Sequence, residues 1–308
     1  MHELRILVGL PASGKSTFAE EKRKEGYAVF SSDEMREKEG YTDNNLLFGE
    51  LHRRIREGLK TGNCIFDATN LSRKNRMALI RQVENYADCV CDLFLVPVNV
   101  CRERNKSRGN NHGVTDFVID RMLKSFSCPW YSEGFSDIVI HAEKGLLGYS
   151  DEDKMTFTQD NPHHTLTLGE HEKKATEYIQ ENCMLTENFP FLLEAARYHD
   201  DGKLFTKTFT DAKGRPTNPP IAHFYRHENV GSYLFLVRGF CARQYDRAGE
   251  YPLTDWGILY TSILIGLHMR PVTAWKKSEK ATERDRIIYG QELFNDVLAV
   301  SEADIQAK

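Results

Sequence analysis

The amino-acid sequence predicts an α/β domain, built on a parallel doubly wound sheet, followed by an all-α domain. Three observations lead to this fold class. Short apolar, strand-like runs alternate with helical segments in the first half of the chain, which favours a parallel sheet. A glycine-rich loop stands between the first apolar run and the first helical segment. After Gly169 only helical periodicity remains, which predicts a second domain without a sheet.

Length and composition agree with two soluble domains. The chain has 308 residues, more than one typical core of about 100–200 residues, and 40% of them are apolar. Its 41 basic and 45 acidic residues give a formal net charge of −4. This balance argues against a protein that coats nucleic acid nonspecifically, but it leaves room for a local basic groove.

Apolar runs in the first half are interpreted as strands. In chain order they are Leu4–Gly9, Tyr27–Phe30, Cys64–Phe66, Cys89–Val96 and Asp137–His141. The intervening segments with helical periodicity are Lys15–Lys24, Leu51–Lys60 and Lys74–Tyr86. Because helices of this length connect parallel strands, the pattern predicts a parallel sheet that binds its ligand at the carboxyl ends of the strands.

The composition changes after Glu143. Residues 146–160 contain several Gly, Ser, Asp and Thr, and we interpret them as a linker between a first domain, 1–145, and a second, 161–308. The helices expected in the second domain are Glu170–Asn182, Phe189–His199, Glu228–Phe240, Thr254–His268 and Gly290–Ser301. Apolar residues recur in them at helical spacing, and no apolar run reaches the length of a membrane span.

The loop Gly9–Thr17, GLPASGKST, fits the P-loop pattern G-x-x-x-x-G-K-[ST] in its required context, with a strand before it and a helix after it. Its glycines let backbone N–H groups wrap phosphates, and the following helix N-terminus favours their negative charge. Lys15 is expected to reach the β- and γ-phosphates of ATP, and Ser16 to bind Mg²⁺. The residues expected to hold the nucleotide are Gly9, Ser13, Gly14, Lys15, Ser16 and Thr17.

Asp33 and Arg36 follow the second strand. A carboxylate at the carboxyl end of a parallel strand faces the ligand, so Asp33 is a candidate base for a hydroxyl that attacks the γ-phosphate. Arg36, one helical turn later, could hold a phosphate of the acceptor. The alternative is structural: Asp33 would cap a helix, and Arg36 would be a surface residue.

Two further segments add candidates to this site. The third strand ends in the sequence DATN, where Asp67 is placed like a Walker B acid, near Mg²⁺ or the acceptor, unless it only caps a helix. Thr69 and Asn70 are substrate-binding candidates beside it. Arg104 and Arg108, four residues apart on one helix face, suit a lid over the transferred phosphoryl group, or else form a solvated surface.

In this order, the segments GLPASGKST, SSDEMR, DATN and RNKSRG resemble the 5′-hydroxyl polynucleotide kinase family of end-healing enzymes over most of residues 1–145. The resemblance implies that Asp33 is the general base on the 5′-hydroxyl and that Arg36 binds the acceptor's 3′-phosphate. It also implies that the lid arginines stabilise the donor phosphates. One departure is Ala68, because some members carry an acid immediately before Thr-Asn, so the role of Asp67 stays open.

A second set of candidates lies in the second half of the chain. Its histidines and aspartates are His171, His199, Asp200, His227, His268 and Asp304. Imidazole and carboxylate ligands together suit a divalent transition metal such as Mn²⁺, Fe²⁺, Co²⁺, Ni²⁺ or Zn²⁺, which activates water for attack on a phosphoester. His223 competes with His227, four residues later. His268 could instead be a core histidine, and Asp304 a surface acid.

The order H…HD…H…H…D, with HDDGK at residues 199–203, resembles the HD-domain phosphohydrolases across residues 160–308. The resemblance implies a first metal held by four residues, His171, His199, Asp200 and Asp304. It implies that His227 and His268 hold a second metal or the scissile phosphate, and that Lys203 neutralises phosphate charge. His163 and His164 are interpreted as structural or as supports for ligands.

Because one chain combines two phosphate chemistries, we expect each domain to act on one of the two ends of a broken strand. Many RNA-cleaving nucleases leave a 5′-hydroxyl and a 2′,3′-cyclic phosphate, and a standard ligase joins neither end. We expect a bifunctional end-healing enzyme that phosphorylates 5′-hydroxyl RNA or DNA ends with ATP and Mg²⁺. With a transition metal it would hydrolyse 2′,3′-cyclic or 2′(3′)-phosphate ends. A nucleic-acid ligase that acts afterwards is a plausible partner.

Three alternatives remain. The first is a small-molecule kinase, for nucleosides or a metabolite, fused to an HD nucleotidase. The second is a P-loop kinase that acts on a sugar nucleotide, and the third is a nucleotide sensor that regulates the hydrolase. Arg36 weighs against the first, because it needs an acceptor phosphate, and Asp33 weighs against the third, because a sensor needs no base.

The expected location is the cytoplasm. The seven cysteines lack the paired spacing of a zinc finger, so we interpret them as reduced thiols in a reducing compartment. The first residues enter a strand and the P-loop at once, without the pattern of a signal peptide.

Overall fold

The computed structural model describes the whole chain except for residues 109–112, 146, 163–164 and 246–252. Of residues 242–245 it describes only the backbone. The chain divides into two compact units. The first consists of Met1–Met122 and Pro129–Gly145, and the second of Leu123–Cys128 and Leu146–Lys308.

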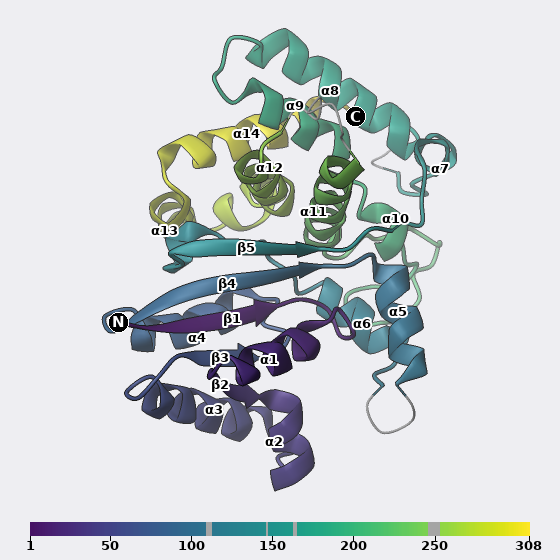
Figure 1. Cartoon of the computed structure of the whole chain (residues 1–308). Helices are drawn as coiled ribbons and strands as arrows, with labels where there is room; N and C mark the ends of the chain where they lie inside the picture. Colours follow the sequence, from purple (N-terminus) through teal and green to yellow (C-terminus); the bar gives the residue numbers. More distant parts are fainter. Residues whose placement is uncertain (109–112, 146, 163–164, 246–252) are drawn as a thin grey trace. The chain divides into compact units, whose positions relative to one another are not determined.

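The sheet of the first unit has five parallel strands in the described residues, in the order β2-β3-β1-β4-β5 (Figure 1). The strands are β1 His2–Val8, β2 Ala28–Ser31, β3 Cys64–Asp67, β4 Ala87–Leu95 and β5 Asp137–Ala142. The predicted parallel α/β sheet is therefore confirmed. Strand β4 is buried except for Asp88, and the apolar residues of β1 are buried as well, as expected for central strands of a parallel sheet.

The helices of the first unit follow short capping signals. They are α1 Lys15–Lys24, α2 Ser32–Glu39, α3 Asn44–Gly58, α4 Arg73–Val83, α5 Val98–Ser107 and α6 Asp116–Leu123, with a 3₁₀ turn at Tyr131–Glu133. Ser31, Asp43 and Ser72 each accept a hydrogen bond from a backbone N–H in the first turn of α2, α3 and α4. These caps fix where each helix begins.

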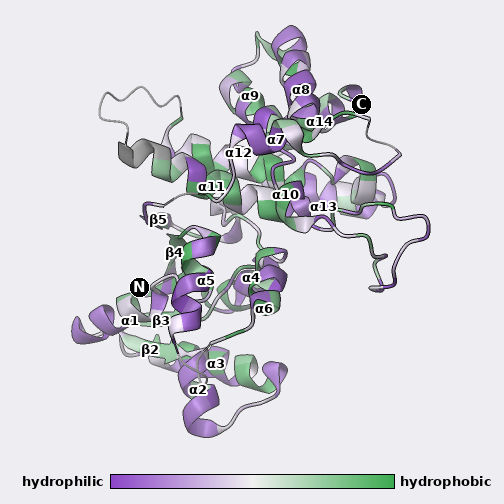
Figure 2. Cartoon of the chain, turned by 90° about the vertical axis from the view of Figure 1, so that its right-hand side faces the viewer, coloured by the Kyte–Doolittle hydropathy of each residue, from purple (hydrophilic) through white to green (hydrophobic). Residues whose placement is uncertain are grey.

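The second unit is helical, which confirms the all-α prediction for this half. Its helices are α7 Asp151–Thr156, α8 Leu168–Cys183, α9 Phe189–Tyr198, α10 Lys203–Thr206, α11 His227–Tyr245, α12 Asp255–Leu267, α13 Glu279–Tyr289 and α14 Gln291–Gln306, with a π-helical turn at Pro271–Trp275. Residues Gly257–Ile265 of α12 are all buried, so this helix lies in the core. Figure 2 shows α11 largely hydrophobic, whereas α8 carries hydrophilic stretches. Among the described residues, no helix combines the length and the apolar character that a bilayer span needs.

Helix α7 lies inside the segment that the sequence marks as a linker. Ser150 and Asp153 form a reciprocal capping box at its start, which stabilises this short helix. Lys154, in the middle of α7, is buried in the second unit. Residues of the expected linker therefore contribute to the core of this unit.

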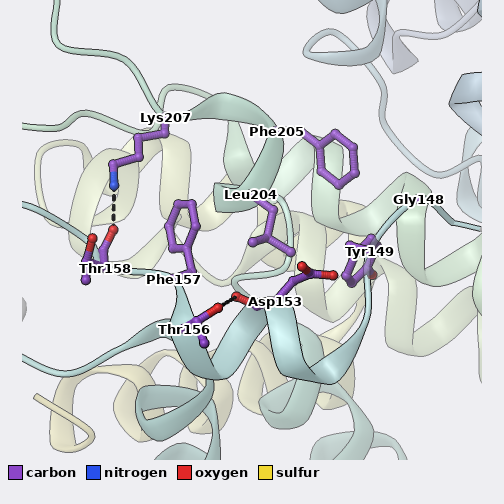
Figure 3. Close-up of a pocket in the computed structure, with 9 residues that line it drawn as sticks. All are labelled: Gly148, Tyr149, Asp153, Thr156, Phe157, Thr158, Leu204, Phe205 and Lys207. Carbon is purple, nitrogen blue, oxygen red and sulfur yellow. Dashed lines mark hydrogen bonds between the residues drawn. The ribbon is translucent and has the colours of Figure 1, made fainter.

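The segment around α7 also lines a pocket of about 440 Å³ (Figure 3). Its lining residues are Gly148, Tyr149, Asp153, Thr156, Phe157, Thr158, Leu204, Phe205 and Lys207. The Lys207 ammonium is 2.7 Å from the Asp160 carboxylate and lies over the Phe157 ring. The pocket is thus lined by aromatic rings and by Lys207, whose ammonium already forms an ion pair with Asp160.

Candidate functional site

Gly9 and Gly14, the two glycines of the P-loop pattern, both lie where the structure favours glycine. Gly9 directly follows β1, and its N–H donates to the Thr69 carbonyl oxygen at 3.1 Å. A Cβ atom at Gly9 would lie 2.9 Å from the Phe94 Cβ atom and 3.1 Å from its carbonyl oxygen, so a larger residue does not fit. Gly14 caps α1 with a φ of 94°, a left-handed conformation that glycine adopts without strain.

The side chain of Lys15 lies inside this loop. Its ammonium donates to the carbonyl oxygens of Leu10 and Gly9 at 2.7 and 3.0 Å, and to the Ser13 hydroxyl at 3.3 Å. Burial lowers the pKa of Lys15 to about 8, and attraction by Asp67 opposes this shift. A lysine ammonium held within a loop of backbone N–H groups is placed where a P-loop binds phosphate.

Asp67 meets the P-loop at the end of β3. The Ser16 hydroxyl donates to Asp67 Oδ2 at 3.1 Å. In the sheet register Asp67 pairs with Ser31, so the ends of β2 and β3 lie side by side. Burial raises the pKa of Asp67, while Lys15 and the hydrogen bond from Ser16 oppose the rise. A hydroxyl and a carboxylate in contact at a phosphate loop offer two oxygen ligands to Mg²⁺.

Asp33 lies in the first turn of α2 and is exposed. The cap of that helix is Ser31, which accepts from the Glu34 N–H, so Asp33 does not serve as the cap that the structural alternative required. Asp33 is close enough to Lys15 to raise its pKa by attraction, against the larger effect of burial. It therefore lies near the loop ammonium and is open to solvent, as a base for an incoming hydroxyl would be.

Arg36 lies one turn further along α2 and is half-buried. Its guanidinium donates to the side-chain oxygen of Asn44 at 2.6 Å, at the start of α3. This bond holds the guanidinium on the side of α2 that faces α3.

The rest of the DATN segment is tied to the protein backbone. The buried Asn70 side chain donates to the Leu7 carbonyl oxygen at 2.9 Å, and Thr69 accepts from Gly9 through its main chain. The buried Arg76 donates to the carbonyl oxygen of Asn70 at 3.0 Å and pairs with Glu133 at 2.6 Å. The observed contacts of Asn70 are structural, and a substrate contact by Thr69 or Asn70 stays a prediction.

The two lid arginines differ in their surroundings. Arg104, on α5, pairs through both terminal nitrogens with the Glu143 carboxylate, at 2.7 Å for the Nη1 atom. Arg108 is the C-cap of α5 and is exposed. After burial, which is the main cause, repulsion by Arg108 also lowers the pKa of Lys15. Arg108 is thus the lid arginine whose charge reaches Lys15 of the P-loop, and Gly109 beyond it lies outside the described residues.

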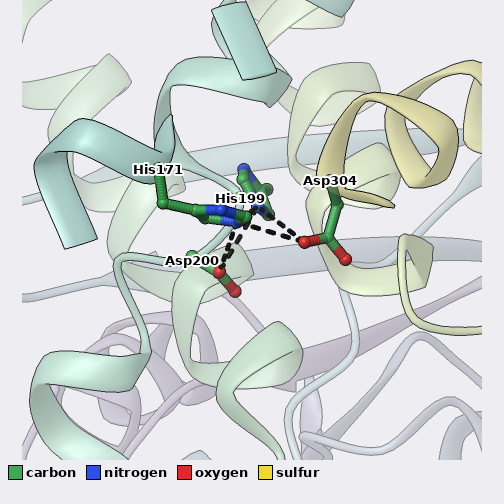
Figure 4. Close-up of side chains that lie close together, drawn as sticks. All are labelled: His171, His199, Asp200 and Asp304. Carbon is green, nitrogen blue, oxygen red and sulfur yellow. Dashed lines mark hydrogen bonds and ion pairs between the residues drawn. The ribbon is translucent and has the colours of Figure 1, made fainter. Parts of the chain in front are cut away.

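In the core of the second unit, His171, His199, Asp200 and Asp304 meet as one group (Figure 4). The Nε2 atom of His171 lies 3.2 Å from Asp200 Oδ2 and 3.1 Å from Asp304 Oδ1. The Nε2 atom of His199 lies 3.3 Å from Asp200 Oδ2 and 3.7 Å from Asp304 Oδ1. Two imidazoles and two carboxylates therefore converge from helices that are far apart in the sequence.

A second group shares Asp200 with the first. The Nε2 atoms of His227 and His268 lie 3.0 and 3.8 Å from Asp200 Oδ1. The two carboxylate oxygens of Asp200 thus face different pairs of rings, because Oδ2 contacts His171 and His199. A carboxylate in this position suits a bridge between two cations.

The ring orientations test whether a metal fits. The Nδ1 atoms of His171, His199, His227 and His268 lie 3.3, 2.8, 2.8 and 2.7 Å from the carbonyl oxygens of Ala307, Ala196, Phe224 and Ile265. A ring that donates from Nδ1 presents a lone pair at Nε2. The Nε2 atoms of His171 and His199 are 3.1 Å apart, and those of His227 and His268 are 3.3 Å apart. Two ring nitrogens this close repel unless a proton or a metal ion lies between them, so these residues fit a divalent metal.

The charges of the cluster also favour a cation. Burial alone would raise the pKa of Asp200, but Lys203 and the neighbouring histidines hold it well below its usual range. Burial opposes the charged form of His199, yet attraction to Asp200 outweighs it and raises the pKa of this ring. His268, buried beside His199 and His227, has its pKa lowered to about 3. A divalent ion requires an ionised carboxylate and imidazoles that are neutral or can give up a proton, and this cluster offers both.

Lys203 contacts the bridging aspartate directly. Its ammonium lies 2.6 Å from Asp200 Oδ2 and donates to Gln159 Oε1 at 2.8 Å. The side chain is buried, as are both of its partners. Lys203 is therefore placed to offset negative charge at the cluster, and Gln159 fixes its direction.

Sequence reasoning missed the residues behind the cluster. Glu172 Oε1 accepts a hydrogen bond from the Asp200 N–H at 3.3 Å. Lys154 pairs with Glu172 at 2.5 Å and with Asp201 at 2.8 Å, and Tyr149 donates to the same aspartate. Glu172 and Asp201 each stand next to a cluster residue in the sequence, which is the one signal that could have pointed to them.

The open choice between His223 and His227 has a geometric answer. His227 faces Asp200, whereas His223 precedes α11 and stacks on Tyr225 with ring centroids 5.4 Å apart. His163 and His164 lie outside the described residues. The ligand roles of the six cluster residues remain predictions, but their side chains do come together.

Comparisons with known proteins bear on the first unit. Residues 4–129 match a family model described as an AAA domain. A search of curated proteins found no match. Among solved structures, a gluconokinase from Sinorhizobium meliloti 1021 is 17% identical, covers 46% of this chain and 83% of its own, and has a TM-score of 0.35. The match of residues 4–129 makes the first unit a P-loop kinase-like domain, which implies ATP and Mg²⁺.

Proposed function

We propose that this chain is a bifunctional end-healing enzyme for broken nucleic-acid strands. Its first unit phosphorylates 5′-hydroxyl ends with ATP, and its second hydrolyses 2′,3′-cyclic or 2′(3′)-phosphate ends. The observation that carries the proposal is that one chain combines a P-loop and a nearby solvent-open carboxylate, Asp33, with a cluster of four imidazoles and two carboxylates. Phosphate addition and phosphate removal are useful together on opposite sides of one break.

In the first unit, the residues around the P-loop bind the donor. The backbone N–H groups of Gly9–Thr17 and the Lys15 ammonium hold the phosphates of ATP. Ser16 and Asp67, already in contact, hold Mg²⁺, which neutralises charge on the β- and γ-phosphates. Arg108 stabilises the charge on the phosphoryl group during its transfer.

The acceptor is bound and activated from α2. Asp33 takes the proton of the attacking 5′-hydroxyl as the oxygen bonds to the γ-phosphorus and the bond to the β-phosphate oxygen breaks. Arg36 binds a phosphate of the acceptor strand, one turn away on the same helix. A free nucleoside or a sugar acid lacks a phosphate at this place, so the pair Asp33 and Arg36 supports a polynucleotide acceptor.

In the second unit, His171, His199, Asp200 and Asp304 would hold one divalent ion, and Asp200, His227 and His268 could hold a second. Such an ion would lower the pKa of a bound water, so that hydroxide is available to attack phosphorus near neutral pH. The backbone carbonyls that accept from each Nδ1 keep the rings aimed at the centre. Lys203 offsets the charge of the phosphate oxygens.

Transfer to each of three acceptors tests the kinase half. Full-length protein is incubated with γ-labelled ATP, Mg²⁺ and either a 5′-hydroxyl oligonucleotide, a free nucleoside or gluconate. Label on the oligonucleotide alone supports the proposal. Label on the nucleoside or on gluconate, with none on the oligonucleotide, shows that the first unit is a small-molecule kinase.

A metal screen tests the hydrolase half. Matched RNA and DNA oligonucleotides with a 3′-phosphate, and RNA with a 2′,3′-cyclic phosphate, are incubated with Mn²⁺, Fe²⁺, Co²⁺, Ni²⁺ or Zn²⁺. Release of phosphate or opening of the cyclic end, lost in Asp200→Ala, supports the proposal. No change at any end with any of these ions would refute this half, whatever the kinase does.

A further inference from the structure

The six cluster residues differ slightly in their exposure to solvent. In the part of the chain that the structure describes, Asp304 and His227 keep 8% and 6% of their surfaces exposed, and the other four cluster residues keep at most 1%. The protein surface nearest to the centre therefore lies beside Asp304 and His227. The residues that border His227 on the surface are accordingly candidates for contact with the rest of the substrate.

A tight turn leads into His227. The Phe224 carbonyl oxygen accepts from the His227 N–H at 3.2 Å and faces its Nδ1 atom at 2.8 Å, so the turn and the ring orientation are fixed together. Arg226 has a φ of 65°, a left-handed conformation that costs an arginine free energy. This turn brings Tyr225 and Arg226 to the surface directly beside a cluster residue.

The Tyr225 ring is held as a flat platform. Its ring stacks on His223 with an interplanar angle of 12° and centroids 5.4 Å apart. His223 is fixed in turn by two backbone hydrogen bonds with Thr208, at 2.8 and 2.9 Å. Tyr225 keeps 38% of its surface exposed, so His223 covers part of the ring and leaves the rest to solvent.

Arg226 places a cation beside this platform. Its side chain is 66% exposed, and its closest acidic partner in the described residues, Glu228, is 3.8 Å away. An aromatic face next to an exposed guanidinium binds a nucleobase by stacking and the adjoining phosphate by charge. That combination recognises a single strand, whose bases are free to stack on protein.

We propose that the turn 223–226, termed the stacking turn, binds the 3′-terminal nucleotides of single-stranded RNA. The terminal base stacks on Tyr225, Arg226 binds the preceding backbone phosphate, and the terminal phosphate enters the centre beside His227. The inference deepens the proposed hydrolase function and rests on it. It distinguishes an RNA end from a mononucleotide, which has no preceding phosphate for Arg226.

Kinetics on two substrates test the stacking turn in the full-length, Mn²⁺-loaded protein. One substrate is a short single-stranded RNA with a 2′,3′-cyclic phosphate, and the other is bis(4-nitrophenyl) phosphate, which has neither a nucleobase nor a second phosphate. Tyr225→Ala and Arg226→Asn should each raise KM for the RNA about tenfold, as loss of one base stack or phosphate contact does. The kcat/KM for bis(4-nitrophenyl) phosphate should stay unchanged. Asparagine is chosen because it tolerates the left-handed conformation.

Two matched variants serve as controls. Tyr225→Phe keeps the aromatic face and should keep the wild-type KM for RNA. Arg215→Gln removes an exposed arginine of the same loop that pairs with Asp211 at 2.6 Å, and it should change neither substrate. An equal loss of kcat/KM on both substrates in Tyr225→Ala would show that Tyr225 only holds His227 in place, which would overturn the inference. An unchanged KM for RNA in both test variants would overturn it as well.

A binding experiment separates this inference from the proposed function. RNA with 5-iodouridine at its 3′ end is irradiated with the full-length protein, and the cross-linked peptide is identified by mass spectrometry. A cross-link at Tyr225 supports the stacking turn even if no RNA end is hydrolysed, in which case the proposed function fails alone. No cross-link, or one confined to other residues, overturns the stacking turn even if the RNA end is hydrolysed.

Discussion

The Ser16 hydroxyl donates a hydrogen bond to Asp67 across 3.1 Å, although the two residues are 51 positions apart in the sequence. The contact arises because β1 and β3 are neighbours in the sheet, so the P-loop after β1 and the carboxylate that ends β3 share one edge. The sequence resemblance left the role of Asp67 open, because some family members carry an acid one residue later. Its position beside Ser16 suits a second oxygen ligand for Mg²⁺.

The first prediction follows from this contact. Asp67→Asn should lower kcat for phosphoryl transfer about 100-fold, the usual effect of removing one charge-stabilising group. Higher Mg²⁺ should restore part of the activity, because the amide keeps one oxygen ligand but lacks the charge. The measurement is a Mg²⁺ titration of kinase rate. Asp88→Asn, an exposed aspartate near the start of β4, is the control and should change nothing. A variant with wild-type Mg²⁺ dependence would contradict the proposed ligand role.

The second prediction concerns the base. Asp33→Asn should lower kcat by between about 10²- and 10⁴-fold, since the amide cannot accept the proton of the attacking hydroxyl. The KM for ATP should stay near the wild-type value, because Asp33 lies on α2 and outside the nucleotide loop. Steady-state kinetics with varied ATP measure both quantities. Glu37→Gln, an exposed carboxylate on the same helix, should retain full activity. A fall in ATP affinity with unchanged kcat would assign Asp33 to the donor site.

The third prediction concerns metal content. Asp200 contacts both histidine pairs, so Asp200→Ala should empty the centre, whereas His268→Ala should remove one ion. After loading with Mn²⁺ and gel filtration, elemental analysis should find about two ions per wild-type chain, about one in His268→Ala and almost none in Asp200→Ala. The kinase should survive in both variants.

His223→Ala is the matched control for metal content. This histidine lies four residues before His227 but stacks on Tyr225, so its loss should leave about two ions bound. Treatment of the wild-type protein with a chelator should abolish hydrolysis, and Mn²⁺ should restore it. One ion in the wild type, or metal loss in His223→Ala, would exclude the shared-carboxylate arrangement.

Periodicity in the sequence predicted most of the fold, but it did not predict the residues that hold the histidine–aspartate cluster in place. Helix α1 has the predicted bounds, Lys15–Lys24, because the P-loop before it and the charged residues after it mark both ends. The choice between His223 and His227 was beyond the sequence, since both fit one face of a helix. In the structure His227 is the one that faces Asp200, because α11 begins at His227 after the turn at Phe224.

Helix α7 shows a different limit. It is short and highly charged, so it has no apolar stripe for a periodicity argument to detect. The capping box of Ser150 and Asp153 was the available signal for a helix. Nothing in the sequence indicates that Lys154 is buried, because its partners Glu172 and Asp201 come from two later segments.

The last prediction tests that buried lysine. Lys154→Met leaves the Glu172 and Asp201 carboxylates buried without their shared cation, which should destabilise the second unit by about 3–5 kcal/mol. The measurement is urea unfolding followed by the fluorescence of Trp256 and Trp275 in a Trp130→Phe background, so that only the second unit reports.

Two comparisons identify the cause of that loss. Lys173→Met removes a lysine whose side chain is 74% exposed, next to Glu172 in the sequence, and should cost little because exposed ion pairs contribute at most about 1 kcal/mol. Adding Asp201→Asn to Lys154→Met removes one of the two stranded charges and should recover part of the stability. If Lys154→Met unfolds at the same urea concentration as Lys173→Met, the buried pair does not hold α7 against α8. In that case packing alone would have to hold Glu172 in the position where it accepts the hydrogen bond from the Asp200 N–H.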